Sequence, residues 1–310
     1  MSFEQSPRAL LMVRPQAFFR NPETAGTNAF QTDGVGAFED VHTLALQQFN
    51  TMVDILRAHH VEVIVVDDTR QPVKPDALFP NNWVTFHEGG QVILYPMMAP
   101  NRRPERRMEI VELLKENFLI TRVIDFSSEE TRGNFLEGTG SIVFDHPNRV
   151  AYACRSPRTH ESLLVKVCDE LGYTFLLFDA VDETGNHIYH TNVVMSIGKK
   201  FAVLCLDAIA SEQDQENLLQ SLSETHHQVI ALSYEQMRAF AGNLLEIESK
   251  EGEAIVILSQ TALKSFLPGQ ISAIAKYGTI LPLEVDCIEK YGGGSVRCMV
   301  AGIHLPKRLK

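Results

Sequence analysis

The alternation of apolar and polar positions along the chain predicts short strands separated by helices. Strand length and β-branched, apolar composition mark residues 61–67, 91–96, 140–145, 190–198, 201–207, 227–232 and 253–259. Apolar residues at helical spacing mark residues 40–59, 104–118 and 160–172, and Gly172 is placed to end the last of these helices. Strands and helices therefore alternate, which indicates an α/β protein.

Short polar turns join several of the predicted strands. Residues 83–86 and 91–96 flank a turn that contains two glycines, and residues 193–198 and 201–207 are almost contiguous. Such short connections predict antiparallel hairpins and therefore mixed sheets. A strand pair followed by a helix and a strand recurs without a fixed sequence period. Because no Pro-, Ser- or Gly-rich linker divides the chain, we expect one catalytic domain over residues 1–310.

Charge and hydropathy narrow the classes of partner. A formal net charge of −11 argues against nucleic acid and anionic membranes, since both attract clustered Lys and Arg. The one basic cluster, Arg102, Arg103, Arg106 and Arg107, is interpreted as a solvated helix start. The sequence shows neither the apolar core of a signal peptide nor the roughly 18 apolar residues of a membrane span. We therefore expect a cytoplasmic protein.

The cysteines argue against a disulfide framework. The five of them are odd in number and lack C-x-x-C spacing: Cys154, Cys168, Cys205, Cys287 and Cys298. The first four are interpreted as structural residues, because a lone cysteine is usually a small core residue. His187 and His190 lie close in sequence but lack matching ligands elsewhere, so we expect no metal. A covalent cysteine mechanism would also need no organic cofactor.

Cys298 has a different context. It follows three consecutive glycines, Gly292–Gly294, which let a backbone approach a ligand closely. The neighbouring Arg297 would favour a thiolate. A nucleophilic thiol also needs a proton-transfer partner, and His190 is a candidate. In an extended chain His190 and Asn192 would share one face, so both would point into one site. The alternative for His190 is a hydrogen-bonded residue at a strand end.

Two more polar clusters stand at strand ends. Asn81 and Asn82 precede the strand that begins near the only tryptophan, Trp83, and Glu137 precedes a small-residue turn. Ordinary turn chemistry would explain each of them alone.

Taken in order, these clusters resemble the guanidine-modifying enzymes of the pentein superfamily, which are arginine deiminases, dimethylarginine hydrolases and amidinotransferases. The resemblance covers nearly the whole chain, and its most specific part is the run GGG-x-x-R-C-M that ends at Met299. It implies a pentein fan, an α/β propeller of five ββαβ-like modules with pseudo-fivefold symmetry. The repeated strand-helix pattern agrees with this fold.

The resemblance also implies roles for individual residues. Cys298 falls at the nucleophile, His190 at the acid/base histidine and Glu137 at the family glutamate. Asn82 and Asn192 fall where family members acting on guanidinium have two aspartates, and Arg158 falls at the partner of the substrate α-carboxylate. Further candidates for substrate contact are Asn81, Arg297, Asn28, Arg14 and Phe30.

The two asparagines bear on the substrate. An amide offers both a donor and an acceptor, which suits a neutral ureido group, whereas a buried guanidinium facing two amides would lose roughly several kcal/mol of compensation. Together with residues 12–31, this combination resembles the citrulline-utilisation hydrolases, often described as amidinotransferase-like. That subgroup implies conversion of citrulline to ornithine, ammonia and carbon dioxide through a covalent Cys298 intermediate.

Two alternatives remain open at this stage. Within enzymes, the chain could be an arginine deiminase or an amidinotransferase that tolerates asparagine, or could take an N-acylated arginine. Outside enzymes, it could be a non-catalytic pentein used as a binding module, as in a translation factor of this fold. The expected partner is a small amino-acid substrate, and the sequence is compatible with a homo-oligomer without fixing the oligomeric state.

Overall fold

A three-stranded unit occurs five times in the computed structural model, which describes residues 4–32 and 38–308. In every unit the middle strand pairs antiparallel with one neighbour and parallel with the other. The first unit is β15 (Ala301–Ile303), β1 (Ala9–Arg14) and β2 (Glu62–Asp67), and the second is β3 (Val84–Phe86), β4 (Gln91–Leu94) and β5 (Arg122–Asp125). The other three are β6 (Ile142–Asp145), β7 (Val150–Cys154) and β8 (Thr174–Phe178); β9 (Met195–Ile197), β10 (Phe201–Leu204) and β11 (Gln228–Ala231); and β12 (Leu245–Glu248), β13 (Ala254–Ser259) and β14 (Thr279–Leu283).

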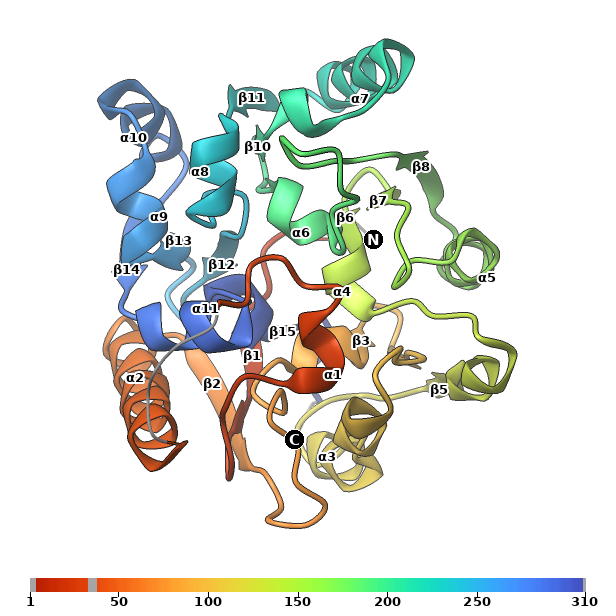
Figure 1. The fold of residues 1–310 in the computed structure, drawn as a ribbon, viewed down its shortest axis with the longest axis vertical. Coiled ribbons are helices and arrows are strands. Elements are labelled where there is room, and N and C mark those ends of the chain that lie inside the picture. Colours follow the sequence, from red (N-terminus) through yellow and green to blue (C-terminus); the bar gives the residue numbers. More distant parts are fainter. Residues whose placement is uncertain (1–3, 33–37, 309–310) are drawn as a thin grey trace.

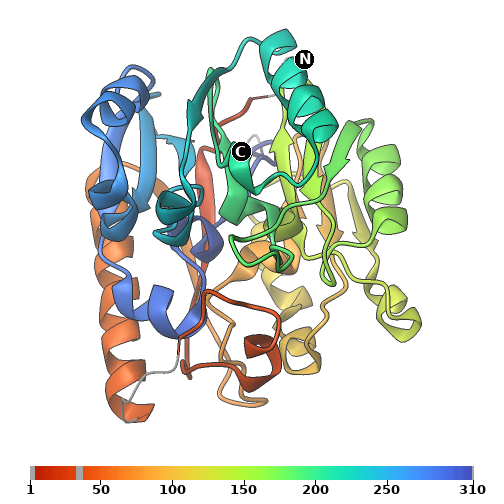
Figure 2. The same cartoon turned by 45° about the horizontal axis from the view of Figure 1, so that its top comes forward.

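Helices connect the middle strand of each unit to its parallel partner, since parallel neighbours need a crossover connection. These helices are α2 (Phe38–Ala58), α3 (Met108–Leu114), α5 (Glu161–Leu171), α7 (Glu212–Glu224), and α9 (Gln260–Ser265) with α10 (Pro268–Ile274). Figure 1 shows them around the outside of the molecule, with the units arranged about its centre. Figure 2 shows α2 standing along one outer edge. The predicted five-module α/β fan is therefore confirmed.

The two ends of the chain meet in the first unit. β15, the last strand, pairs antiparallel with β1 and is linked to β3 by the bridge between Ile303 and Phe86. The first and second units thereby join into one six-stranded sheet. The segment that carries Cys298 is thus held by strands from the start of the chain.

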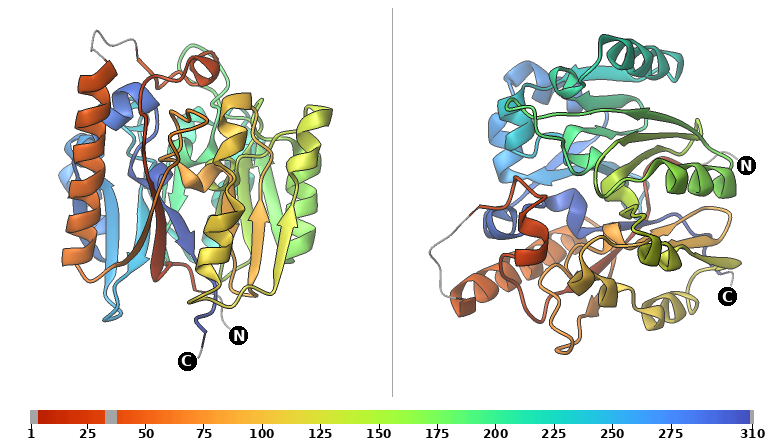
Figure 3. Two further views of the ribbon diagram at one scale, coloured as in Figure 1. Left: turned by 90° about the horizontal axis from the view of Figure 1, so that it is seen from below. Right: turned by 45° about the vertical axis from the view of Figure 1, so that its right-hand side comes forward.

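Short helical segments lie directly before the innermost strands. They are η1 (Pro80–Asn82) before β3, α4 (Gly138–Ser141) before β6, α6 (Thr191–Val194) before β9, and η5 (Val296–Met299) before β15. The remaining elements are α1 (Pro22–Ala25), α8 (Tyr234–Arg238), α11 (Asp286–Gly292), η2 (Pro100–Glu105), η3 (Ser127–Arg132) and η4 (Leu206–Ala208). Figure 3 shows α1 and α11 at the same end of the strands.

Most of the predicted elements are present, with one correction. All seven predicted strand segments contain a strand, and the three predicted helices appear as α2, α3 and α5, with Gly172 ending α5 in the left-handed conformation. Residues 191–194, however, form the single helical turn α6, and β9 begins only at Met195. His190 and Asn192 therefore do not share the face of a strand, and the turn itself aims their side chains.

Hydropathy along the described helices is also informative about membranes. None of the helices within residues 4–32 and 38–308 combines the length and the apolar character that crossing a bilayer requires.

Candidate active site

Cys298 lies in η5, buried to 5% exposure, between two amide side chains. Asn243 donates from Nδ2 to the sulfur at 3.3 Å, and Asn192 donates from Nδ2 at 3.5 Å. Asn243 Oδ1 also lies 3.7 Å from the sulfur. The two amides therefore hold the Cys298 side chain in position.

The other four cysteines lack such surroundings. All are buried and unpaired, and burial raises the pKa of the Cys154 and Cys168 thiols to about 12 and of the Cys205 and Cys287 thiols to about 11. Their thiols remain protonated at neutral pH, as expected of structural residues.

His190 and Glu137 form a buried pair beside the nucleophile. His190 Nε2 lies 2.9 Å from Glu137 Oε2, and both side chains are almost fully buried. Burial would raise the pKa of Glu137, but the Arg158 guanidinium and the His190 hydrogen bond together hold this pKa well below its usual range. Burial lowers the pKa of His190 to about 4, against the opposing effect of Glu137. At neutral pH the pair is therefore an ionised carboxylate and a neutral imidazole.

This protonation state fixes the tautomer of His190. The Nε2–H group donates to Glu137, which leaves Nδ1 as the proton acceptor. His190 and Cys298 line the same cavity, so the imidazole can take part in proton transfer within it.

Asn82 is oriented by Arg102. Arg102 Nη1 donates to Asn82 Oδ1 at 2.9 Å, and Arg102 also makes a two-point pair with Glu105 at 2.9 Å for each contact. A guanidinium can only donate, so the Asn82 atom that faces it must be the carbonyl oxygen. The Nδ2 group of Asn82 is buried without a partner.

Arg102 also corrects the interpretation of the basic cluster as a solvated helix start. This side chain is buried, and Arg106 pairs with Glu130 at 2.5 Å. A buried cation needs charged partners, and Glu105 supplies one for Arg102. Arg102 therefore supports the site, and Arg106 is held in an ion pair instead of facing solvent.

The cavity in front of Cys298 is closed on one side by the segment that contains α1. Arg158 Nη2 donates to Thr24 O at 3.2 Å and to Thr27 Oγ1 at 2.6 Å, and Asn28 Nδ2 donates to Gly293 O at 3.2 Å. The Arg158 guanidinium also lies 5.0 Å from the centre of the Tyr189 ring. These contacts hold the segment over the glycine-rich loop.

Asp76 completes the charged lining of this cavity. Its Oδ2 accepts from Asn21 Nδ2 at 2.7 Å, whereas Oδ1 is buried without a partner. Burial raises the pKa of Asp76, and the Arg102 guanidinium opposes that shift. A substrate group that donates hydrogen bonds would satisfy Oδ1.

The structure brings most of the sequence candidates to this cavity. The candidates that line it are Cys298, His190, Asn82, Arg158 and Asn28, while Glu137 and Asn192 contact lining residues.

Four of the candidates lie elsewhere. Arg14 pairs with Asp67 at 2.5 Å at the end of β1, so we no longer expect it to bind substrate. Asn81 is buried beneath the site, where its carbonyl approaches Gly138. Arg297 lines a different cavity on the axis of the fan, and Phe30 packs near Phe240.

Sequence reasoning missed Asn243, Arg102 and Asp76. Asn243 is fully buried and precedes β12, just as Asn82, Asn192 and Cys298 precede the innermost strands of their own units. The repeat could have identified Asn243. In a protein built from repeated units, a polar residue that precedes the innermost strand of one unit indicates that the equivalent residues of the other units also lie at the centre of the fan.

Metal ligation has no geometric support in the part of the chain that the structure describes. Within residues 4–32 and 38–308, no three or more His, Cys, Asp and Glu side chains are grouped closely enough to hold an ion.

In a comparison with known families, a family described as "N,N dimethylarginine dimethylhydrolase, eukaryotic" matches residues 14–305. A search of curated protein sequences finds no significant match.

Several solved structures share the fold. The substrate-bound N-terminal domain of ArgZ, an arginine dihydrolase from the ornithine-ammonia cycle in cyanobacteria, superposes with a TM-score of 0.74 at 15% identity over 96% of this chain and 98% of that one. AgrE with L-arginine gives 0.74 at 18% identity, over 97% of this chain but only 40% of AgrE. A dimethylarginine dimethylaminohydrolase adduct with S-methyl-L-thiocitrulline gives 0.63 at 15% identity, over 95% and 99%.

Proposed function

The chain belongs to the N,N-dimethylarginine dimethylhydrolase family of the pentein superfamily, as a hydrolase of carbon–nitrogen bonds, and on that premise we propose that it hydrolyses citrulline to ornithine, ammonia and carbon dioxide. Cys298 is the proposed nucleophile and His190 the proposed acid and base.

The observation that carries the proposal is the orientation of Asn82. Its oxygen is occupied by Arg102 at 2.9 Å, and only its unpartnered Nδ2 donor is left for a substrate. A ureido group presents a carbonyl oxygen that accepts this hydrogen bond, whereas a guanidinium presents only donors. If a guanidinium N–H faced Asn82 Nδ2, neither donor would find an acceptor. Each buried donor left unpaired in this way costs about 1–3 kcal/mol.

The rest of the cavity suits an amino-acid zwitterion. Arg158 supplies a planar guanidinium for an α-carboxylate, and the free Oδ1 of Asp76 supplies an acceptor for an α-ammonium group. To take this role, Arg158 has to exchange its contacts with Thr24 and Thr27 for the substrate. Substrate entry therefore requires movement of the α1 segment.

The first chemical step is proton transfer followed by attack. His190 Nδ1 takes the proton of the Cys298 thiol, and the Asn243 and Asn192 amides stabilise the resulting thiolate. The sulfur attacks the ureido carbon, whose oxygen is held by Asn82 Nδ2. The imidazolium then protonates the departing nitrogen, and Glu137 stabilises the positive charge on the ring.

Hydrolysis of the covalent intermediate completes the reaction. If the ornithine amine leaves first, Cys298 retains an S-carbamoyl group. Neutral His190 takes a proton from water, which attacks this group and releases the thiol and carbamic acid. Carbamic acid decomposes to ammonia and carbon dioxide, so one citrulline and one water give one ornithine, one ammonia and one carbon dioxide.

A second candidate is hydrolysis of arginine. The free carboxylate oxygen of Asp76 favours it, because this group could face a guanidinium instead of an α-ammonium. AgrE has been solved with L-arginine and ArgZ is an arginine dihydrolase. Arginine would give citrulline with one ammonia or ornithine with two, so the substrate consumed and the ammonia released per ornithine distinguish the two candidates.

The test is a substrate panel with product identification by mass spectrometry. Citrulline, arginine, dimethylarginine and an N-acylarginine are each incubated with the full-length protein. We expect ornithine and ammonia in equal amounts from citrulline, and no turnover with Cys298→Ser at an unchanged melting temperature. Faster turnover of arginine or dimethylarginine than of citrulline would overturn the proposed substrate, and full activity of Cys298→Ser would overturn the mechanism.

A variant of Asn82 tests whether its free Nδ2 donor binds the substrate. Asn82→Asp replaces the free donor with an acceptor, so kcat/KM for citrulline should fall at least about tenfold, as one lost buried hydrogen bond implies. The ratio of arginine to citrulline turnover should rise. Asn117→Asp adds the same charge at an exposed position in the turn that follows α3 and should change neither value. Equal losses for both substrates would contradict the assigned role of Asn82.

A further inference from the structure

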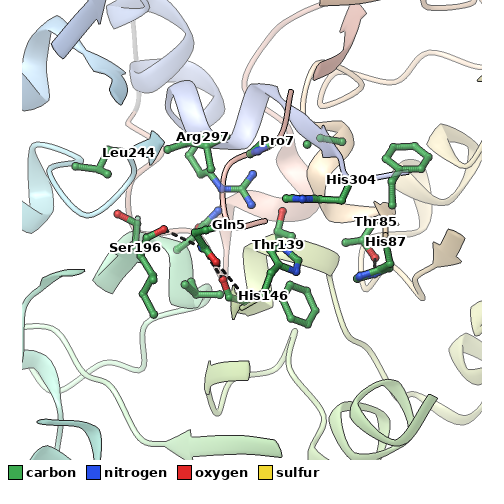
Figure 4. Close-up of a pocket in the computed structure, with 18 of the residues that line it drawn as sticks. Gln5, Pro7, Thr85, His87, Thr139, His146, Ser196, Leu244, Arg297 and His304 are labelled. Carbon is green, nitrogen blue, oxygen red and sulfur yellow. Dashed lines mark hydrogen bonds between the residues drawn. The ribbon is translucent and has the colours of Figure 1, made fainter. Parts of the chain in front are cut away.

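A second cavity lies on the axis of the fan, behind the nucleophile. It is lined by residues of all five innermost strands, β3, β6, β9, β12 and β15, and has a volume of about 50 Å³ (Figure 4). Asn192 separates it from the substrate cavity, because its side chain lines the axial cavity while its Nδ2 contacts Cys298. This cavity has no part in the mechanism proposed above.

The lining is basic. Arg297, His87, His146 and His304 all border the cavity, and Figure 4 shows the Arg297 guanidinium and the His304 ring directed toward the same space. Within the described residues, no Asp or Glu lines the cavity and no carboxylate pairs with Arg297, whose guanidinium donates to Val300 O at 3.1 Å. Burial lowers the pKa of Arg297 to about 10, so the group is still a cation at neutral pH.

Two polar atoms on the wall of this cavity have no partner. Ser196 is 6% exposed and its Oγ makes no hydrogen bond, and His87 is 4% exposed with an unpartnered Nδ1. A buried polar atom without a partner is costly, and an unpaired buried cation more so. Both costs disappear when a ligand accepts hydrogen bonds from these groups.

We propose that the axial cavity binds a small inorganic oxyanion. Arg297 supplies the charge and two or more N–H donors, and Ser196 and the histidine rings supply further donors. The volume is several times the roughly 10–15 Å³ that one water occupies by this measure, which fits an anion of four or five heavy atoms. Bicarbonate and phosphate share this chemistry.

An anion held here would act on the nucleophile through two contacts. The backbone N–H of Arg297 donates to Asn243 Oδ1 at 3.1 Å, and Asn243 in turn contacts the Cys298 sulfur. The second contact is Asn192, which lines the axial cavity and donates from Nδ2 to the Cys298 sulfur at 3.5 Å. Anion binding at Arg297 would therefore fix the wall behind Cys298.

The first test measures thermal unfolding of the full-length protein in sodium sulfate, phosphate and bicarbonate, against sodium chloride at equal ionic strength. Binding to the folded state raises the melting temperature with concentration. At least one oxyanion should raise it above the chloride value with saturation at low millimolar concentration, whereas the general stabilisation by sulfate and phosphate does not saturate. The anion that saturates at the lowest concentration is the preferred ligand. Equal melting temperatures in all four salts would overturn the proposal.

Ser196→Ala keeps the test independent of folding defects. It removes an unpartnered hydroxyl, so without oxyanion the variant should be as stable as the parent or more stable. Its dissociation constant for the oxyanion should rise about five- to tenfold, as loss of one hydrogen bond implies. An unchanged constant overturns the site, and neither readout depends on enzymatic activity.

The position of the anion is tested by crystals soaked in sodium selenate. The anomalous signal of selenium should give a peak between Arg297 and His304. A peak only elsewhere, or no peak at a concentration that stabilises the protein in solution, would reject this cavity as the site.

Discussion

Asn243 Nδ2 donates to the Cys298 sulfur at 3.3 Å, across a sequence separation of 55 residues. The same side chain accepts from the Arg297 backbone N–H at 3.1 Å and donates to Asn192 O at 2.9 Å. One buried amide thus holds the nucleophile's own segment and the turn that carries Asn192. Asn243 contacts the reacting sulfur from outside the substrate cavity, which it does not line.

Asn243→Ala should lower kcat with little change in KM. The lost donor to a charged sulfur is worth about 1.5–3 kcal/mol, which corresponds to roughly 10- to 100-fold in rate. Steady-state kinetics with the preferred substrate measure both constants. Asn148→Ala is the matched control, since it removes side-chain hydrogen bonds to Asp145 outside the site and should lower stability alone. If kcat fell equally in Asn243→Ala and Asn148→Ala, Asn243 would have only a structural role.

Gly140→Ala should abolish most of the activity. A Cβ at this position would lie 2.5 Å from Asn82 Nδ2 and 2.7 Å from His190 Cε1 and Nδ1, so both side chains must move. Positioning accounts for a large part of such a reaction's rate, and we expect a loss of about 100-fold or more in kcat/KM. Gly26→Ala, at the end of α1, meets no atom within 4 Å and should leave kcat/KM near the wild-type value. Activity of Gly140→Ala close to that of Gly26→Ala would contradict the close contact.

The architecture could be predicted because the burial of a strand and the repetition of the strand-helix unit both leave a local pattern of apolar residues in the sequence. Residues 253–259 are a continuous apolar run, and they form the buried middle strand β13. The strand β5 escaped prediction because it has only four residues, and its exposed ends Arg122 and Asp125 leave no apolar run. β15 has only three residues, Ala301–Ile303, and owes its pairing to β1 at the other end of the chain.

The site was only partly predictable for a similar reason. Cys298 has a local signal in its glycines, and His190 and Glu137 follow from the resemblance. Arg102 was interpreted as a surface charge, because its contacts with Glu105 and Asn82 form only when the segments η1 and η2 fold and pack together. Distances of this kind depend on tertiary packing, which a single sequence does not state.

Thiol labelling should single out Cys298. Burial raises the pKa of Cys154, Cys168, Cys205 and Cys287, so these four thiols stay protonated and react slowly near pH 7.5. Iodoacetamide followed by peptide mapping should find Cys298 alkylated first, and citrulline should slow that reaction. Cys168→Ser should keep the fast phase and Cys298→Ser should lose it. Fast labelling of any of the four structural cysteines would count against the site.

The pH dependence of stability should reveal the buried His87. Burial lowers the pKa of His87 to about 3, below the ordinary value of 6.5, while its ring Nε2 lies 2.7 Å from Thr85 Oγ1. Between these values the unfolded chain binds a proton that the folded protein does not, so folding is destabilised as pH falls below 6.5, by about 1.4 kcal/mol per pH unit. In urea unfolding from pH 6.5 to 4, His87→Gln should show a slope that is shallower by this amount. His59→Gln, at an exposed position, should keep the wild-type slope, and a wild-type slope in His87→Gln would mean that His87 is protonated in the folded protein.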